Sequence, residues 1–432
     1  MVGLVFGVFF LLIIIGVPIA VAVIVPSLLV SVIDPSFAAN AVYVFRNMIT
    51  GINTYTLIAV PLFMLSSELM ARGGMSDRLF DFFAYFFGHT PSGFPVAVVI
   101  TCLFYGAICG SAPATVAAIG GMCIPLLVHL GYDKKFVVSM IAVAGGLGVI
   151  IPPSLPFITY GMATGVSVGD LFMAGFVPGI VIGICLIIYV IIYCNRHDMS
   201  GLKIKEYSRN IRERGFKDIV KRGIFALLAP VVILGGIYTG IVSPTEAACI
   251  AVVYSLIVSI FIFRSLTIKE LVNCLVATAK MATPVMLIFS VCTVFGRILA
   301  LLNVPQSVAD AVTSSVSSKF VVLVVINVFL LVVGMLMENG PAILILAPIL
   351  LKVLAPYGVD PLHFGIVMVT NLAIGYVTPP IGTNLFVANS LTGIPILEIA
   401  KHAIPFIIMF LVALVLITAI PEISTFLPLL LK

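Results

Sequence analysis

Residues 110–120 read GSAPATVAAIG and residues 151–154 read IPPS; a related pattern returns at residues 337–350, MENGPAILILAPIL, and 378–386, TPPIGTNLF. The matched positions keep both identity and spacing: Gly131 and Asp133 with Gly358 and Asp360, Pro152-Pro153 with Pro379-Pro380, and Pro178 with Pro405. Each pair is separated by 227 positions, as from residue 152 to residue 379. One shared register for a Gly-x-Asp, a Pro-Pro and a further Pro predicts that residues 110–178 and 337–405 are copies of one structural repeat.

The composition is that of a membrane protein. Of 432 residues, 62% are hydrophobic and 9% are charged, which leaves too little charge to cover the surface of a soluble protein. Several stretches of about 20 residues with few or no charges are long enough to cross a hydrocarbon core of about 30 Å. The first, residues 2–33, is too long for one upright crossing, and Gly16, Pro18 and Pro26 are expected to divide it. We therefore expect an all-α, multi-pass membrane protein.

One polar segment, Asn195 to Arg222, separates the two copies and carries nine of the 22 Lys and Arg residues. Because loops rich in Lys and Arg stay in the cytoplasm, it predicts a solvated cytoplasmic loop rather than a lipid-headgroup or nucleic-acid site. The chain then divides into a first membrane half at 1–194, a basic loop at 195–222 and a second half at 223–432. If the first half crosses the membrane an odd number of times, the second half is inverted. Inverted halves are typical of secondary transporters, whose substrate site lies near the midplane between the repeats.

Each copy contains an apolar segment that is broken in its middle. Residues 95–130 are interrupted at 110–115, and residues 320–354 are interrupted at 337–342. Gly and Pro at these points stop the helical hydrogen-bond ladder, and the freed backbone groups cannot face lipid. A re-entrant helical hairpin, which turns at the break and leaves on the side it entered, satisfies both conditions. We expect one hairpin tip at each interruption.

The Pro-Pro pairs predict a second kind of break, with one helix ending before each pair and another beginning after it. Carbonyl groups at such a break suit Na⁺, which prefers oxygen ligands, and N–H groups at a helix start suit an anion. Ser, Thr and Asn at these breaks also cap broken helices in any protein, which is the alternative explanation. Because the breaks form two matched pairs, we expect one cation site in each repeat. The predicted Na⁺-site residues are Gly110, Ser111, Pro113, Pro152, Pro153, Ser154, Glu338, Asn339, Gly340, Thr378, Pro379, Thr383 and Asn384.

At these residues the chain resembles the large membrane subunit of the TRAP (tripartite ATP-independent periplasmic) transporters. The resemblance rests on the four stretches quoted above and on SPTEAA at 243–248, which together span nearly the whole chain in the order typical of the family. It implies an elevator-type Na⁺ symporter of the bacterial inner membrane with no organic cofactor. It also implies a periplasmic substrate-binding protein and a small membrane subunit of about four helices as partners. The implied substrates are organic acids, including C4-dicarboxylates and sialic acids.

Four residues are candidates to contact such an acid: Arg297, Ser111, Ser154 and Glu246. Arg297 is the one cation between Met281 and Val304, and a guanidinium can hold a carboxylate with two hydrogen bonds. We expect it to face the midplane cavity near Ser111 and Ser154; the alternative is an Arg that reaches to lipid headgroups.

Two acidic residues, Glu246 and Glu68, are also placed to stabilise local structure. Glu246 follows Ser243 at the spacing of a capping box, which competes with a substrate role. Glu68 and Arg72, spaced i, i+4, are expected to form a structural pair.

Other functions fit the sequence less well. No zinc-protease, nucleophile–histidine or Walker motif supports an enzyme, and the five histidines are scattered. Hairpins and broken helices favour a gated carrier over an open channel. A stand-alone Na⁺/carboxylate symporter that needs no binding protein remains the main alternative.

Overall fold

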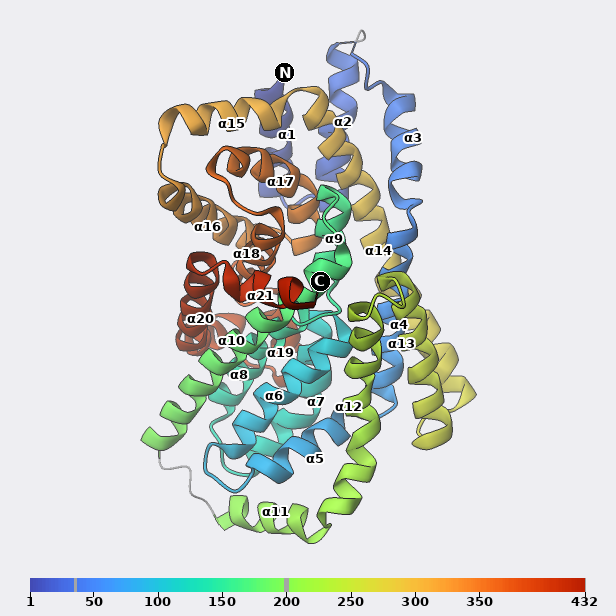
Figure 1. Cartoon of the computed structure of the whole chain (residues 1–432), viewed down its shortest axis with the longest axis vertical. Helices are drawn as coiled ribbons and strands as arrows, with labels where there is room; N and C mark the ends of the chain where they lie inside the picture. The colour runs from blue at the N-terminus through green and yellow to red at the C-terminus, as the bar shows by residue number, and fades with distance from the viewer. Residues whose placement is uncertain (35–36, 198–201, 432) are drawn as a thin grey trace.

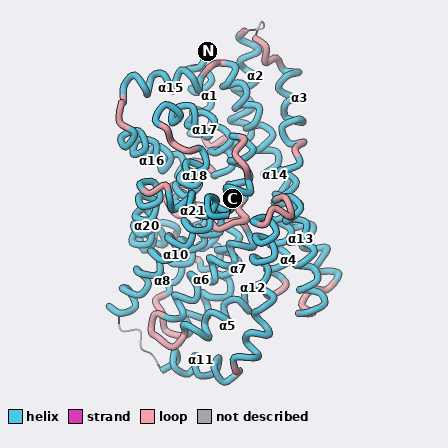
Figure 2. Tube along the Cα trace, in the orientation of Figure 1, coloured by secondary structure: helices cyan, strands magenta, loops and turns pink. Residues whose placement is uncertain are grey.

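The computed structural model describes residues 1–34, 37–197 and 202–431, and within these ranges the chain consists of helices joined by loops (Figure 2). The first half is built from α1 (Val2–Ile14), α2 (Ile19–Ile33), α3 (Ala41–Ile52), η1 (Tyr55–Ile58), α4 (Ala59–Arg72), α5 (Met75–Phe87), α6 (Gly93–Cys109), α7 (Ala112–His129), α8 (Lys134–Ala144), η2 (Gly145–Val149), α9 (Leu155–Thr164) and α10 (Val168–Arg196). The connecting helix is α11 (Leu202–Glu213). The second half is built from α12 (Phe216–Tyr238), α13 (Pro244–Ile257), η3 (Val258–Ile262), α14 (Ile268–Leu301), α15 (Val304–Ser315), α16 (Lys319–Leu336), α17 (Asn339–Leu354), η4 (Ala355–Tyr357), α18 (Pro361–Gly375), α19 (Thr383–Thr392), α20 (Ile396–Ala419) and α21 (Glu422–Leu431).

Eight helices of the described chain are long and apolar enough to span a membrane, or nine if one bent pair counts as a single span. That pair is α3 with η1–α4, which meet at an angle of 61°. The expected division of the first apolar segment lies at Gly16, whose φ of +86° suits glycine, and at Pro18, which precedes α2. Pro26 does not divide it, because it lies buried inside α2. The fold is thus the expected all-α, multi-pass membrane fold.

The segment at 195–222, expected as a loop, is largely helical. It contains α11 and the first turns of α12, and α10 continues to Arg196. α11 forms because Ile204, Tyr207 and Ile211 recur every three or four residues and make an apolar stripe that packs against α5. Ile211 is 1% exposed. High charge concealed this amphipathic period in the sequence.

The two copies correspond element by element: α5 with α15, α6–α7 with α16–α17, α8 with α18, α9 with α19, and α10 with α20. In Figure 1, α5 and α11 lie at the lower end of the molecule and α15 lies at the upper end. The hairpin α6–α7 occupies the lower half and α16–α17 the upper half. The copies therefore enter from opposite ends, which is the inverted arrangement. Because segments rich in Lys and Arg stay in the cytoplasm, we expect the end that carries the basic α11 to be the cytoplasmic end.

The helices form two groups, which also contact each other through α12 against α5 and α14 against α17. The frame group consists of α1–α4 from the first half and α12–α14 from the second. Helices of the two halves pack on each other in this group, with α2 against α14 and α13 against α4. The hairpin group consists of α5–α10 and α15–α21. Helices of the two halves pack on each other here too, with α9 against α17 and α19 against α7. The copies differ in their frame segments: α3–η1–α4 is bent, whereas α14 runs for 34 residues with Pro284 inside it.

Candidate functional site

The first hairpin turns at Gly110 and Ser111, as the sequence predicts. Gly110 ends α6 with φ +65°, and a Cβ there would lie 2.8 Å from the carbonyl oxygen of Pro153. The N–H of Leu155 donates to the Gly110 carbonyl at 3.4 Å. The hairpin tip is thus fastened to the broken helix of its own repeat.

The first broken helix passes from α8 through η2 and the Pro152-Pro153 pair to Ser154, which precedes α9. The Ser154 hydroxyl is buried and donates to the Val149 carbonyl at 2.5 Å. On the facing tip, the Thr115 hydroxyl donates to the Ser111 carbonyl at 2.8 Å. Both hydroxyls donate here, and the Ser154 oxygen also accepts from the Phe157 N–H at 3.5 Å, which caps α9. Ser154 therefore keeps one lone pair that can ligate.

The second hairpin turns at Met337 and Glu338, again where expected. Asn339 begins α17 and is 2% exposed, and its amide nitrogen has no partner within the described chain. Glu338 is exposed at the tip and its side chain caps no N–H group. The N–H of Ile381 donates to the Met335 carbonyl at 3.3 Å, which links the last turn of α16 to the second broken helix.

The second broken helix leaves α18, passes through Pro379-Pro380 and resumes at Thr383. The Thr378 hydroxyl donates to the Ile374 carbonyl at 2.7 Å. The side-chain oxygens of Thr383 and Asn384 are buried and have no partner in the part of the chain that the structure describes. A buried polar atom without a partner costs free energy, so a water molecule or a cation at these oxygens would be stabilising.

The first candidate site joins its hairpin tip to the broken helix of the same repeat. At the second, the last turn of α16 contacts Ile381 of the break, and α19 packs on α7 and α8 of the first repeat. By their position in the chain, the predicted Na⁺-site residues divide between the two repeats: Gly110, Ser111, Pro113, Pro152, Pro153 and Ser154 in the first, and Glu338, Asn339, Gly340, Thr378, Pro379, Thr383 and Asn384 in the second. Hydroxyl, amide and backbone oxygens are the ligands that a hard cation prefers, and the unpartnered oxygens of the second site fit that chemistry.

Glycine pairs hold both sites together. A Cβ on Gly106 of α6 would lie 2.7 Å from the Cα of Gly148 in η2, and a Cβ on Gly375 would lie 2.1 Å from the carbonyl oxygen of Gly334 in α16. Real Cβ atoms do not come so close, so each hairpin reaches its broken helix only through glycine.

Sequence reasoning missed a polar cluster beside the second site. Asn371 of α18 donates through its amide to the Asn327 backbone carbonyl at 2.9 Å and to the Asn327 side-chain oxygen at 2.8 Å. The Asn371 oxygen and the neighbouring Thr370 hydroxyl are buried without partners among the described residues. The sequence does contain a sign of this cluster: its polar residues interrupt the apolar runs VVINVFLL and VMVTNLAIG.

Arg297 of α14 has a protein partner on α3. Its guanidinium donates to the side-chain oxygen of Asn47 on α3, and the residue is exposed. The same face of α14 packs on α3 through Ser290, which donates to the Met48 carbonyl at 2.8 Å. The structure thus pairs Arg297 within the frame group, and no described contact joins it to Ser111 or Ser154. Residue spacing placed Arg297 in an apolar run but could not show which face of α14 it occupies.

Glu246 forms the capping box that the sequence offered as the alternative to a substrate contact. Its carboxylate accepts from the Ser243 N–H at 2.7 Å and from the Ser243 hydroxyl at 2.8 Å, which completes a capping box at the start of α13. Glu270 and Thr267 build the same box at the start of α14. The Glu246 carboxylate is therefore occupied by its own helix and lies outside both candidate sites.

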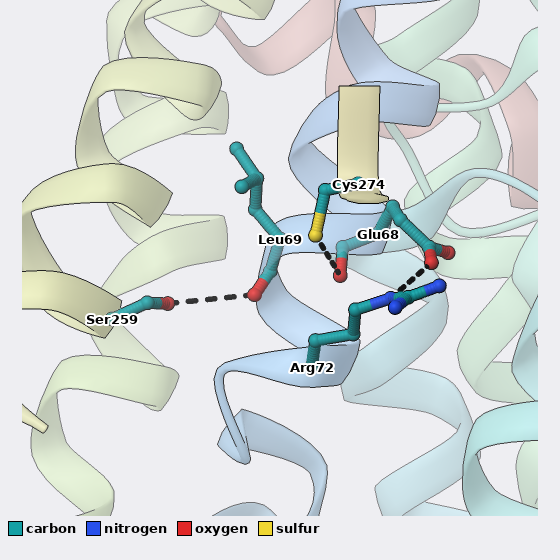
Figure 3. Close-up of polar contacts among 5 residues, drawn as sticks. All are labelled: Glu68, Leu69, Arg72, Ser259 and Cys274. Atoms are coloured by element: carbon teal, nitrogen blue, oxygen red, sulfur yellow. Dashed lines mark hydrogen bonds and ion pairs between the residues drawn. The ribbon is translucent and has the colours of Figure 1, made fainter. Parts of the chain in front are cut away.

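The expected pair of Glu68 and Arg72 is confirmed, with Nε and Oε1 2.6 Å apart on α4 (Figure 3). Figure 3 also shows Cys274 of α14 donating to the Glu68 carbonyl at 3.9 Å and Ser259 of η3 donating to the Leu69 carbonyl at 3.4 Å. The ion pair thus belongs to the contact among α4, η3 and α14, and its role is structural.

Comparison with known proteins assigns the architecture to a family. The family model described as "Tripartite ATP-independent periplasmic transporter, DctM component" matches residues 6–423. The chain is 41% identical over 421 residues to the isethionate TRAP transporter permease protein DctMQ of Oleidesulfovibrio alaskensis; the match covers 98% of this chain but only 65% of that relative. It is 38% identical to the C4-dicarboxylate TRAP transporter large permease protein DctM of Pseudomonas aeruginosa, with 87% and 86% of the two chains covered.

A solved structure shares the fold at low sequence identity. It is the Neisseria gonorrhoeae protein MtrF, with a TM-score of 0.65, 13% identity and 93% of each chain covered. At 13% identity, this similarity supports a shared arrangement of helices and nothing further. The sequence matches carry the assignment further: the chain belongs to the DctM family of TRAP transporters and is a multi-pass transporter of the bacterial inner membrane rather than an enzyme.

Proposed function

We propose that this chain carries out Na⁺-coupled uptake of an organic acid, with one Na⁺ site in each repeat. The observation that carries the proposal is the second site, where the Thr383 and Asn384 oxygens are buried without partners beside a broken helix. Oxygen ligands at a helix break are the usual means by which secondary transporters hold a coupling cation. The first site repeats the same construction at Ser111 and Ser154.

The proposed cargo is a small organic anion of the C4-dicarboxylate or sialic-acid class or of similar size. The relatives named above are described as permeases for isethionate and C4-dicarboxylates, which are small organic anions. The neutral donors Ser111 and Ser154, together with the N–H groups at the starts of α7 and α9, supply the chemistry that an anion requires. The proposed partners are a periplasmic binding protein that delivers the acid and a small membrane subunit of about four helices.

The proposed mechanism is an elevator. The hairpin group carries both sites, and the frame group supports it through α14 against α17, α4 against α6 and α12 against α5. Because each tip is tied to its own broken helix, the hairpin group can move as one body without opening a site to lipid. Na⁺ and acid then cross together in the rigid group.

The proposal is tested by uptake into proteoliposomes that contain the chain, its small subunit and a candidate binding protein. Succinate, isethionate and N-acetylneuraminate serve as labelled probes. The expected result is uptake of at least one probe that requires an inward Na⁺ gradient and stops when choline replaces Na⁺. Equal uptake in choline would contradict Na⁺ coupling.

A stand-alone symporter is the second candidate, and omission of the binding protein separates the two. Under the proposal, uptake without the binding protein falls to the level of empty vesicles. Undiminished uptake would assign the function to the stand-alone type.

A further inference from the structure

Two charged cavities lie beside α11 at the cytoplasmic end, and they differ in how their charges are used. The first has a volume of about 220 Å³ and is lined by three arginines and three aspartates: Arg78, Arg214, Arg222, Asp77, Asp81 and Asp218. Arg214 pairs with Asp81 at 3.0 Å, and Arg222 pairs with Asp218 at 2.9 Å. Burial raises the pKa of the Asp81 carboxyl, and the Arg214 guanidinium opposes that rise. The charges of this cavity balance one another, and the Arg214–Asp81 pair holds α5 against the turn between α11 and α12.

The second cavity has an excess of positive charge. It has a volume of about 480 Å³, and its charged lining is Lys205, Arg209, Arg212 and Glu213, with His89 from the turn after α5. The Glu213 carboxylate forms an ion pair with the Arg209 guanidinium, with Oε1 and Nε 3.4 Å apart. Lys205, Arg212 and His89 have no hydrogen-bond or ion-pair partner among residues 1–34, 37–197 and 202–431. Two cations therefore remain unpaired around one concave space.

The surroundings of this second cavity favour an amphiphile over a free anion. Phe86 and Phe87 directly precede the lining residues Gly88 and His89, and their exposed fractions are 43% and 39%. Phe216 is 53% exposed and stacks edge-on to Phe86 with ring centroids 6.2 Å apart. Exposed aromatic rings beside cations are typical of the boundary between acyl chains and headgroups.

We propose that the cavity between α11 and the turn at Gly88–His89 binds the phosphate headgroup of an anionic phospholipid of the cytoplasmic leaflet. Lys205 and Arg212 supply charge-assisted hydrogen bonds to phosphate oxygens, and the planar guanidinium of Arg212 can bind two of them at once. The acyl chains run along Phe86 and Phe216. Such a lipid fixes α11, which links the two halves, to the membrane surface.

The test uses the purified full chain, lipid-stripped in neutral detergent and titrated with phosphatidylglycerol or phosphatidylcholine while bound lipid is counted by native mass spectrometry. The cavity variant carries three changes: Lys205→Gln, Arg209→Gln and Arg212→Gln. The matched control removes the same charge from exposed lysines outside the cavity: Lys203→Gln, Lys217→Gln and Lys221→Gln. A charge-conserving variant, Lys205→Arg with Arg212→Lys, shows whether the cavity tolerates substitution.

The unsubstituted chain is expected to prefer phosphatidylglycerol. The cavity variant is expected to bind it about tenfold to a hundredfold more weakly, because each surface cation contributes about 1 kcal/mol. The control and the charge-conserving variant are expected to keep the affinity of the unsubstituted chain. Equal losses in cavity variant and control would overturn the proposal in favour of general surface charge. Inorganic phosphate that displaces the lipid completely at millimolar concentration would also overturn it and assign the cavity to a soluble anion.

Discussion

The side-chain amide of Asn384, at the start of α19, donates to the carbonyl oxygen of Ala142 on α8 at 2.8 Å. The two residues belong to different repeats, so the candidate cation site of the second repeat is fastened to the first. The amide uses its nitrogen for this bond and leaves its oxygen buried without a described partner. One side chain thus both joins the repeats and presents an oxygen at the helix break.

Thr383→Val is expected to separate cation binding from folding. The substitution removes a buried hydroxyl that has no described partner and keeps the shape of the side chain. Stability in choline chloride should be unchanged or slightly higher, because an unsatisfied polar group disappears. The Na⁺ concentration for half-maximal thermal stabilisation should rise about tenfold.

The control is Thr392→Val on the same helix, whose hydroxyl donates to the Ala388 carbonyl at 2.7 Å. It should leave the Na⁺ response unchanged. A normal Na⁺ response in Thr383→Val would remove this hydroxyl from the cation site.

Gly375→Ala should loosen the second hairpin. A methyl group there meets the Gly334 carbonyl oxygen at 2.1 Å, so α16 and α18 must separate. We expect a loss of about 1–3 kcal/mol of stability, measured by thermal unfolding in detergent, and loss of uptake. Gly121→Ala on α7 is the control, because a Cβ at that position meets nothing within 4 Å. If the two variants unfold at the same temperature, the glycine contact does not fasten the hairpin.

Arg297→Ala and Asn47→Ala should have similar effects, because each removes one side of the same hydrogen bond. Each substitution is expected to lower the free energy of unfolding by about 1–3 kcal/mol. Neither should change the half-saturating concentration of the transported acid. The checks are thermal unfolding and concentration-dependent uptake. A large rise in the half-saturating concentration for Arg297→Ala alone would restore the substrate role that the sequence suggested.

Thr90 and Ser317 occupy equivalent exposed loops before the first helix of each hairpin, 227 positions apart. With the exposed Cys249 replaced by Ser, Thr90→Cys should react with an impermeant maleimide only from the cytoplasm and Ser317→Cys only from the periplasm. Labelling of both from one side would contradict the inverted arrangement.

The sequence predicted the backbone of this protein better than the directions of its side chains. Both hairpins turn at the Gly and Pro residues that interrupt the apolar segments, because such breaks are local properties of the chain. α11 was missed because its apolar period is short and lies under many charges. The contact of Arg297 was not predicted for a different reason: its partner, Asn47, lies 250 positions away and on another helix. The unpartnered oxygens of Thr383 and Asn384 were anticipated as residues, but their isolation is a tertiary property that spacing cannot reveal.

The central claim is that the two broken helices bind Na⁺, and equilibrium binding of radioactive sodium to the purified full chain tests it without knowledge of the substrate. The account predicts saturable Na⁺ binding that excess K⁺ does not displace. Thr383→Val should weaken Na⁺ binding at the second site about tenfold, Ser154→Ala should weaken binding at the first, and the double variant should weaken both. Absence of saturable Na⁺ binding in the folded chain, or equal displacement by K⁺, would contradict the account.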